Sequence, residues 1–367
     1  MNNIAYFLNV PWGWIKQRPH FIAEELANDF AVTVFETANF KKSVQQNSKT
    51  CSLKFKKLFR LPLQRNINIL KINNLLYKMQ LRNKLNKYNI IWLTHPVQIS
   101  FIKDNIKDSL LIYDCMDDML SFPTVDYKKY RYFKVNEKLL LDMADFVFCS
   151  SAYLKNMLEQ RYNKDITKKS MIINNAITKE LLNIRLVSTS YKSKDKYKHI
   201  VYLGTIAEWI DFQLICDSLE EFSDIVYDFY GPVRMEISIR NERIRFHGSV
   251  EYADISKVLM SADMLVMPFK VIDLVKSVNP VKLYEYIYTG IPSVAVSYKE
   301  TEKFGDFVYL YNNKKEYYTL LDKLIKNELS SKQNYKNSIE FLQENTWDKR
   351  KDVINSKLNE LIITRWN

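Results

Sequence analysis

The chain has 367 residues, about twice the size of a usual single domain, so two domains are expected. Apolar residues make up 47% of the chain and charged residues 26%, a balance that excludes a disordered chain and is typical of a globular protein. The start has no basic segment before an apolar stretch, and no run of 18 apolar residues occurs, so we expect no signal peptide, no membrane span and a cytoplasmic location.

Cysteine and histidine are too scattered along the chain to indicate a metal site. The four cysteines form no C-x-x-C pair, and the four histidines form no H-x-x-x-H pair. We therefore expect neither structural zinc nor a disulfide framework, and no metal cofactor.

Short apolar runs in the first half of the chain predict the strands of a parallel sheet. Runs of this kind are buried on both faces when helices cover the sheet. The predicted strands span residues 4–8, 32–35, 90–93, 110–113 and 146–149. A helix is predicted over residues 19–28, and further helical stretches separate the later strands. The alternation is that of a doubly wound α/β fold.

The formal charge of +12 is concentrated in one window of the chain. Residues 41–87 contain thirteen Lys and Arg and no Asp or Glu, and the basic residues alternate with apolar ones. This pattern favours contact with an anionic membrane surface. A solvated basic face is the alternative. A nucleic-acid partner is not expected, because no helix-turn-helix, zinc finger or RNP-like aromatic motif accompanies the patch.

The second half of the chain repeats the same alternation. Its predicted strands span residues 199–203, 226–230, 244–247, 264–267 and 293–296. The polar stretch at residues 188–198 predicts a linker between two Rossmann-like domains. A last helix is predicted from residue 346 to about residue 362.

Three of the six glycines directly follow predicted strands of the second half. Gly204, Gly231 and Gly248 lie where a parallel sheet turns at its carboxyl edge, which is the ligand-binding edge of such sheets. The segment after Gly204 leads into a helix whose first N–H groups could receive a diphosphate. Ordinary turn glycines are the alternative. The chain has no G-x-G-x-x-G and no P-loop motif, which disfavours a dinucleotide fold and an ATPase.

The most informative local pattern follows the predicted strand at residues 264–267. A loop presents Lys270, and a helix is predicted to begin near Pro280. Lys282 and Glu285 are three residues apart and share a face of that helix. The ammonium group can meet a phosphate, and the carboxylate can accept hydrogen bonds from two ribose hydroxyls. An exposed helical Lys–Glu pair without a ligand is the alternative.

The chain resembles the GT-B nucleotide-sugar glycosyltransferases, most of all the family 4 type that builds bacterial surface polysaccharides. The likeness rests on residues 262–296, with Pro-Val-Lys-Leu-Tyr-Glu-Tyr and Gly-Ile-Pro-Ser-Val, on residues 202–209 and on the Trp-Gly-Trp at residues 12–14. It implies an α/β fold of two Rossmann-like domains whose parallel sheets face each other across a cleft. Residues 1–187 would bind the acceptor and residues 188–345 the nucleotide sugar. Residues 346–367 would form a helix that returns to the first domain.

The resemblance also implies which residues bind the donor. Glu285 would hold the ribose, Lys282 the diphosphate, and the turn of Gly204 and Thr205 the phosphates. The remaining donor-binding candidates are Lys270, Ser277 and Asn279. The nucleoside-diphosphate sugar would be a substrate, and no cofactor or metal ion is implied.

Three departures from the family 4 pattern affect the predicted chemistry. The first glutamate of the usual E-x7-E motif falls on Ser277, and a histidine that many relatives use falls on Met116. The basic residue that commonly follows the strand-end glycine is also replaced, with Glu208 and Asp211 nearby. Phosphate charge would then be met by Lys270, Lys276, Lys282 or Arg18, because departure of the diphosphate requires a cation.

Asp117 becomes the candidate catalytic group, as a general base on an acceptor hydroxyl in a reaction with inversion. If configuration is retained, Asp117 would instead orient the donor sugar. Asp114 and Asp118 are alternatives, and one of these carboxylates is expected to cap a turn. Arg18, His20 and His95 are candidate acceptor or phosphate contacts.

The sequence thus predicts transfer of a hexose-type sugar to a lipid-linked or oligosaccharide acceptor in cell-surface polysaccharide synthesis. The protein would work peripherally on the inner face of the cytoplasmic membrane. A nucleotide-sugar epimerase of the same fold is one alternative. The other is a carbohydrate-binding or scaffold protein that has lost catalysis.

Overall fold

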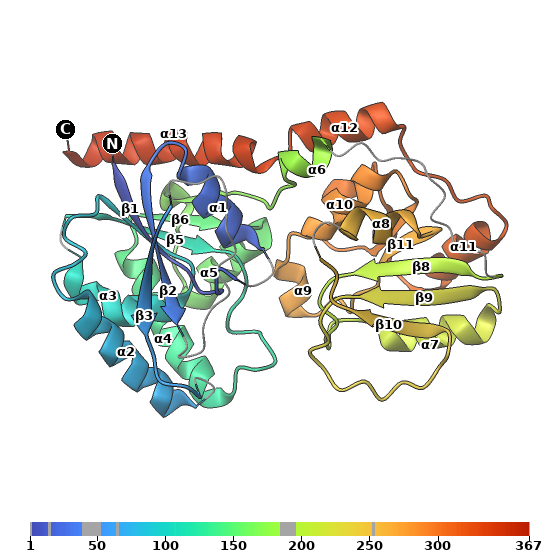
Figure 1. Ribbon diagram of the computed structural model, residues 1–367, viewed down its shortest axis with the longest axis horizontal. Helices are drawn as coiled ribbons and strands as arrows, with labels where there is room; N and C mark the ends of the chain where they lie inside the picture. The colour runs from blue at the N-terminus through green and yellow to red at the C-terminus, as the bar shows by residue number, and fades with distance from the viewer. Residues whose placement is uncertain are drawn as a thin grey trace. The chain divides into compact units, whose positions relative to one another are not determined.

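A computed structural model describes residues 2–13, 16–38, 53–63, 66–106, 108–183, 196–251 and 254–366 (Figure 1). The chain divides into two compact units. The first unit comprises Met1–Asn175 together with Trp347–Asn367, and the second comprises Ala176–Thr346. The predicted linker at residues 188–198 lies mostly outside the described residues. Residues 41–52, the first part of the basic window at residues 41–87, also lie outside them.

A seven-stranded parallel sheet forms the centre of the first unit, in the order β3-β2-β1-β4-β5-β6-β7. Its strands are β1 (Asn3–Phe7), β2 (Ala31–Ala38), β3 (Lys54–Phe59), β4 (Ile90–Leu93), β5 (Leu110–Cys115), β6 (Phe146–Cys149) and β7 (Ser170–Ile172). Its helices are α1 (Arg18–Leu26), α2 (Ile67–Leu81), α3 (Ile99–Ile102), α4 (Tyr127–Met143), α5 (Ala152–Tyr162) and α13 (Trp347–Trp366).

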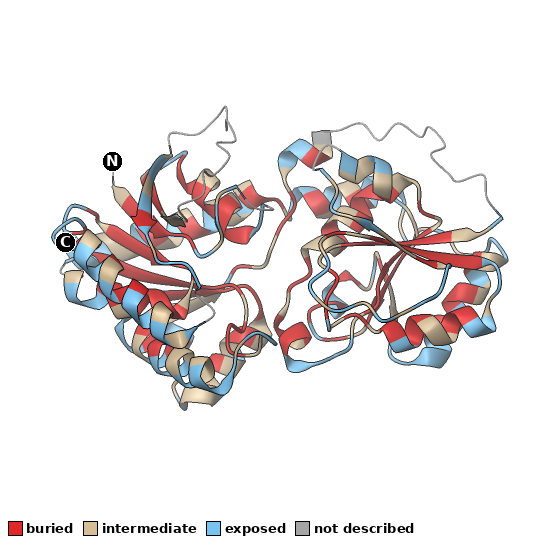
Figure 2. Cartoon of the chain, turned by 60° about the horizontal axis from the view of Figure 1, so that its bottom comes forward, coloured by how far each residue is buried: buried red, intermediate tan, exposed pale blue. Residues whose placement is uncertain are grey.

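Helices cover both faces of this sheet, which explains why its central strands are apolar throughout. Figure 1 shows α2, α3 and α4 on one face and α1 and α13 on the other. Every residue of β4, β5 and β6 is buried (Figure 2). The alternation of strand side chains therefore supplies two separate cores, one on each face.

The C-terminal helix α13 belongs to the first unit. Trp347 at its start stacks on Phe21 of α1, with ring centroids 5.3 Å apart. Arg365 near its end pairs with Asp145 at 2.8 Å. Contacts at both ends of the helix thus bind the last residues of the chain to its first domain.

A six-stranded parallel sheet forms the centre of the second unit, in the order β10-β9-β8-β11-β12-β13. Its strands are β8 (Lys198–Leu203), β9 (Ile225–Tyr230), β10 (Ile244–Gly248), β11 (Met264–Met267), β12 (Ser293–Val296) and β13 (Tyr309–Tyr311). Its helices are α6 (Lys179–Asn183), α7 (Phe212–Glu221), α8 (Ile255–Met260), α9 (Asp273–Ser277), α10 (Val281–Thr289), α11 (Lys314–Ile325) and α12 (Tyr335–Gln343).

Both sheets are doubly wound, with the strand order reversing between β1 and β4 and between β8 and β11. The predicted α/β fold with two Rossmann-like domains is therefore confirmed, and all ten predicted strands overlap observed ones. Three edge or near-edge strands, β3, β7 and β13, were not predicted. In parallel α/β sheets, ligands bind where the strand order reverses, beyond the carboxyl ends of the strands. The ends of β8 and β11 are thus the first place to examine.

Candidate functional site

Two glycines beyond β8 and β9 bring bare backbone together at the reversal point of the second sheet. Gly231 has φ +140°, and a Cβ atom built on it would lie 1.9 Å from the carbonyl oxygen of Gly204. Gly204 has φ +155°, and its own Cβ would lie 2.7 Å from Oη of Tyr202. Neither position accepts a side chain. The backbones of the two strand ends therefore pack directly against each other, and the amides of Gly204 and Gly231 donate to Tyr230 O at 2.8 Å and to Gly248 O at 2.7 Å.

The loop that follows Gly204 is fixed by backbone hydrogen bonds to its neighbours. The amide of Ile206 donates to Pro232 O at 3.0 Å, and the amide of Lys270 donates to Trp209 O at 2.8 Å. Asp211 caps α7, since its carboxylate accepts a hydrogen bond from Leu214 N at 3.1 Å. A carboxylate thus occupies the α7 N-terminus, where the sequence suggested a diphosphate. The turn at Gly204 and Thr205 remains as the phosphate candidate of this loop.

Helix α10 begins at Val281, directly after Pro280, as predicted. Nζ of Lys282 lies 3.2 Å from Oε2 of Glu285, so the two side chains share one face of the helix. Glu285 is mostly buried and Lys282 is about one-third exposed. An ammonium group and a carboxylate side by side can bind a phosphate and a diol, respectively.

Tyr286 attaches α10 to the reversal point of the sheet. Its hydroxyl donates to Val266 O of β11 at 3.3 Å and accepts from Leu203 N of β8 at 3.1 Å. The side chain is fully buried. One tyrosine therefore binds the helix that carries Lys282 and Glu285 to both central strands. The sequence analysis did not identify this role, because a tyrosine on the apolar side of a helix is indistinguishable from ordinary core.

The loop before α10 is held by a buried carboxylate from beyond β12. Oε2 of Glu300 accepts a hydrogen bond from Nδ2 of Asn279 at 3.1 Å and pairs with Nζ of Lys303 at 2.6 Å. The hydroxyl of Tyr298 donates to Val278 O at 3.1 Å. Glu300 has no exposed surface. Asn279, a predicted donor-binding residue, is therefore fixed from a segment that the sequence analysis did not connect with it.

The other predicted residues of this unit lie nearby along the chain. Ser277 is buried, and its hydroxyl donates to Leu274 O at 2.6 Å, within its own short helix. Lys270 is exposed in the loop after β11. Lys276 pairs with Asp273 at 2.9 Å on the surface. Lys270 and Lys282 thus remain candidate cations for a phosphate at the carboxyl edge of this sheet.

Arg18 and Asp114 form a buried ion pair in the first unit. Nη2 of Arg18 lies 2.8 Å from Oδ1 of Asp114, and both side chains are almost wholly buried. Nη1 of Arg18 donates to Ile173 O at 2.6 Å. The guanidinium group therefore joins the start of α1 to β5 and to the chain beyond β7. Moving this guanidinium group away from Asp114 to bind a ligand would leave a buried carboxylate unpaired, which costs free energy.

Asp117 and Asp118 follow β5 and have different environments. Oδ2 of Asp118 accepts a hydrogen bond from Ser121 at 2.5 Å and pairs with Nη2 of Arg161 at 2.7 Å. Its Oδ1 accepts from Leu120 N at 3.2 Å. Asp118 is thus the carboxylate that caps the turn.

The Asp117 carboxylate forms no hydrogen bond or ion pair with any residue that the structure describes. Burial raises the pKa of Asp117 from 3.8 to about 7, an effect that Arg18 opposes and that Asp114 and Asp118 reinforce. A carboxylate with a pKa near neutrality suits proton transfer at physiological pH. Among the three neighbouring aspartates, Asp117 therefore has the environment of a general base.

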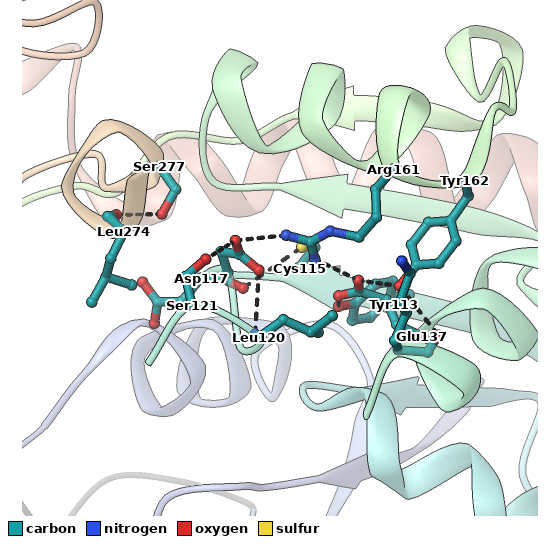
Figure 3. A network of polar contacts seen from close by, with 12 residues as sticks. Tyr113, Cys115, Asp117, Leu120, Ser121, Glu137, Arg161, Tyr162, Leu274 and Ser277 are labelled. Carbon is teal, nitrogen blue, oxygen red and sulfur yellow. Dashed lines mark hydrogen bonds and ion pairs between the residues drawn. The ribbon is translucent and has the colours of Figure 1, made fainter. Parts of the chain in front are cut away.

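Arg161 holds the capping turn through a second buried carboxylate (Figure 3). Its Nη1 lies 2.9 Å from Oε2 of Glu137, which also accepts a hydrogen bond from the Tyr162 hydroxyl at 2.7 Å. Burial raises the pKa of Glu137 despite these partners. The turn after β5, which carries Asp117, is consequently supported from α4 and α5.

His20 and His95 both act as helix caps in the first unit. Nδ1 of His20 accepts a hydrogen bond from Gln17 N at 3.1 Å, and burial lowers its pKa. Nδ1 of His95 accepts from Val97 N at 3.1 Å, and burial lowers its pKa to about 4. Burial thus disfavours the charged form of both imidazoles, and each has a local role as a capping group.

No group of three or more His, Cys, Asp or Glu side chains in the described ranges is arranged to hold a metal ion. Over the same residues, no helix combines the length and the apolar character that crossing a membrane requires.

Comparison with protein families finds no matching family model. A relative from Bacillus subtilis (strain 168), described as "Putative teichuronic acid biosynthesis glycosyltransferase TuaH", is 22% identical over 240 residues, which cover 60% of this chain and 59% of that protein. The chain thus aligns with less than two-thirds of the length of this relative.

Solved structures match over nearly the whole chain. Sucrose-phosphate synthase from Thermosynechococcus elongatus has a TM-score of 0.73 at 12% identity, with 99% of this chain and 100% of that chain covered. HepE from Anabaena, in complex with UDP and glucose, has a TM-score of 0.65 at 13% identity, covering 97% and 99%. A glycosyltransferase from Rickettsia africae has a TM-score of 0.67 at 12% identity, covering 99% and 98%. The predicted resemblance to GT-B glycosyltransferases is confirmed, and the chain has the GT-B fold.

Proposed function

We propose that this protein is a glycosyltransferase that takes its sugar from a nucleoside-diphosphate donor. The observation that carries the proposal is helix α10, which presents the Lys282–Glu285 pair and is attached by Tyr286 to the central strands of the second sheet. The helix stands at the edge where doubly wound sheets bind ligands. HepE, which shares the fold, was solved with UDP and with UDP-glucose.

In the proposed donor site, each residue meets one part of the nucleotide sugar. Glu285 accepts hydrogen bonds from the ribose hydroxyls, and Lys282 neutralises the diphosphate. Peptide groups at Gly204 and Thr205 approach the phosphates, since no side chain at Gly204 or Gly231 stands in the way. Lys270 adds a second cation from its exposed loop. Developing charge on the departing diphosphate is stabilised by such cations.

The Glu300–Asn279 contact supports the rigidity of this donor site. It fixes the loop immediately before α10 at Asn279, two residues after Ser277, which stands where the family pattern has a glutamate. Glu300 is separated from Asn279 by 21 residues, so the contact joins two segments of the second unit. In this proposal, Asn279 helps to shape the donor side of the loop, and Glu300 acts as a positioning residue through its hydrogen bond to Asn279, while Ser277 is buried at the end of α9.

Asp117 is the proposed catalytic group on the acceptor side. As general base, it takes the proton from an acceptor hydroxyl while that oxygen bonds to the anomeric carbon and the bond from this carbon to the diphosphate oxygen breaks. The product sugar is inverted, and the proton resides on Asp117. If configuration is retained, Asp117 orients the donor sugar instead. Asp114 is paired with Arg18, which favours Asp117 over it.

The proposed acceptor is a lipid-linked or oligosaccharide chain in cell-surface polysaccharide synthesis, at the inner face of the cytoplasmic membrane. The similarity to TuaH supports the pathway, and the thirteen basic residues at 41–87 support the location. In this proposal, the first unit binds the acceptor and the second unit binds the donor, as in family 4 enzymes.

Two other functions are compatible with parts of the site. An epimerase of the same fold would change the sugar of its nucleotide substrate without an acceptor. A binding protein without catalysis would agree with Met116 and Ser277, which replace residues of the family pattern. The surviving Lys282–Glu285 pair favours a working donor site over this second alternative.

The direct test is a thermal-shift screen against UDP, GDP, dTDP, CMP and ADP. A ligand that binds only the native state raises the melting temperature by mass action. We expect one nucleotide to raise it and the rise to disappear in Glu285→Ala. Glu360→Ala is a matched control, because Glu360 also pairs with a lysine three residues away, at 2.7 Å, but on α13. No response to any nucleotide would refute the donor site.

A further inference from the structure

Helix α2 has apolar residues on both its inner and its outer side. Its buried side consists of Asn73, Asn74, Tyr77 and Leu81, while Ile72, Leu75 and Met79 on its outer side are 45%, 60% and 67% exposed. A surface helix normally turns its apolar residues to the core and its polar residues to water. The outer apolar residues of α2 therefore need an explanation other than the core of the first unit.

The buried amides have hydrogen-bond partners, so the orientation of α2 is well defined. Oδ1 of Asn73 accepts from Leu61 N at 2.7 Å, and its Nδ2 donates to Leu61 O at 3.1 Å. Nδ2 of Asn74 donates to the Tyr132 hydroxyl of α4 at 2.8 Å. Rotating the helix to bury Leu75 would break these bonds and leave buried polar groups unsatisfied.

The outer side of α2 has an apolar row beside a cationic row. Ile72, Leu75 and Met79 are spaced by three and four residues and form one stripe along the helix. The second stripe consists of Lys71, Lys78 and Arg82, the last of these at the C-cap. All three basic side chains are exposed.

The end of β3, which carries further exposed apolar residues, lies beside α2. Gln80 of α2 donates from Nε2 to Phe59 O at 2.9 Å and accepts from Phe59 N at 2.8 Å. The side chains of Phe59, Leu61 and Leu63 are 57%, 38% and 77% exposed. We call the two rows of α2 together with Phe59, Leu61 and Leu63 the α2–β3 surface.

Charge identifies the kind of partner. The described residues between 53 and 89 include nine Lys and Arg and no Asp or Glu. Lys78 has an exposed ion pair with Asp104 from outside this segment, at 2.5 Å. A helix with an apolar row bordered by cations is the pattern of a segment that lies in the headgroup layer of an anionic bilayer. Each cation near such a surface adds to the attraction.

We infer that the α2–β3 surface docks the first unit on an anionic phospholipid surface, with Ile72, Leu75 and Met79 inserted among the lipids. The inference rests on the proposed function for its place in the cell, and it names the side chains that would make the contact. A solvated basic face would not require the apolar row, and a neutral bilayer would not attract the cationic one. Both rows are required, so both can be tested separately.

The experiment is co-sedimentation of the full-length protein with vesicles. We expect binding to vesicles of phosphatidylcholine mixed with phosphatidylglycerol, weak binding to phosphatidylcholine alone, and loss of binding as salt is raised. Lys71→Gln/Lys78→Gln/Arg82→Gln should weaken binding to the mixed vesicles on the order of 100-fold. Ile72→Ser/Leu75→Ser/Met79→Ser should weaken binding to the same vesicles on the order of tenfold or more.

Matched controls come from the second unit. Tyr335→Ser removes an apolar side chain that is 58% exposed, comparable with Leu75. Lys299→Gln/Lys326→Gln/Lys336→Gln changes the net charge as much as the triple α2 variant does, at exposed ion-paired lysines. Neither control should change vesicle binding.

The inference is overturned if the α2 variants bind like the unmodified protein, or if the control variants lose binding equally. It is also overturned if no vesicle binds, or if mixed-sequence RNA binds these residues in place of vesicles. Nucleotide thermal shifts on the same α2 variants keep the two proposals apart. An α2 variant that loses vesicle binding but keeps its nucleotide thermal shift supports docking. If the unmodified protein binds vesicles but shows no thermal shift with any nucleotide, only the donor site is refuted.

Discussion

Replacing Asp117 with asparagine should stabilise the protein in a pH-dependent way. Burial raises the pKa of Asp117 from 3.8 to about 7, so the folded protein holds a proton that the unfolded chain releases at lower pH. Below pH about 4 both states are protonated, and the carboxyl group has no differential effect on stability. From pH about 4 to about 7 the unfolded state is increasingly favoured, and above about 7 the penalty is constant.

The size of this penalty follows from the shift itself. A change of about three pKa units corresponds to about 4 kcal/mol, and this is an upper limit because Asp117 keeps some contact with solvent, which screens its charge. Asp117→Asn removes the ionisation and should raise the melting temperature at pH 8 by on the order of 2–4 °C per kcal/mol, so by at most about 8–16 °C. At pH 4 the variant and the unmodified protein should melt together.

The assay is a series of thermal melts between pH 4 and pH 8 with the unmodified protein, Asp117→Asn and Asp126→Asn. Asp126 is an exposed helix cap whose pKa is lowered by its hydrogen bonds to Lys129. Its carboxylate contributes stability above the unfolded pKa and loses it as the pH falls, so Asp126→Asn should gain nothing at high pH. A melting-temperature difference for Asp117→Asn that is the same at pH 4 and pH 8 would refute the reasoning.

Three further changes test the architecture of the two units. Gly231→Ala should destabilise the second unit far more than Gly290→Ala, as measured by denaturant unfolding of both variants. A Cβ at position 231 would lie 1.9 Å from the Gly204 carbonyl oxygen, whereas a Cβ at position 290 would meet nothing within 4 Å. Tyr286→Phe should cost about 1–3 kcal/mol in the same assay and weaken nucleotide binding, since a buried amide loses its acceptor. Arg18→Ala should lower the free energy of unfolding by about 3–5 kcal/mol, because it leaves Asp114 buried and unpaired. The double variant Arg18→Ala/Asp114→Ala should recover part of this loss. An unchanged stability of Arg18→Ala would contradict a structural role for the pair.

The fold was predictable because the central strands are buried on both faces. Runs such as residues 90–93 and 264–267 are apolar throughout, which indicates a parallel sheet without any knowledge of contacts. Strand β3 was not predicted because it is an edge strand whose sequence, KFKKLF, leaves most of its side chains exposed. Strands β7 and β13 are edge strands of three residues, too short for a periodic signal.

The candidate site was predictable only where its residues are close in sequence. Lys282 and Glu285 meet because helical periodicity places residues three apart on one face. Glu300 joins Asn279 across 21 residues, and Arg18 reaches Asp114 across 96, distances at which no sequence pattern specifies a partner. For the same reason, the different roles of the three aspartates after β5 became apparent only from their contacts.

The most direct test of the central claim is a turnover measurement with the nucleotide sugar whose nucleotide stabilises the protein. The protein is incubated with that donor, with and without a membrane lipid extract as the acceptor source, and released nucleoside diphosphate and the labelled sugar are followed together. We predict that the nucleotide is released only with the acceptor present, in proportion to the sugar that becomes attached to it, and that both products are lost in Glu285→Ala. Nucleotide binding without release, or a sugar that changes configuration while still attached to its nucleotide, would contradict a glycosyltransferase.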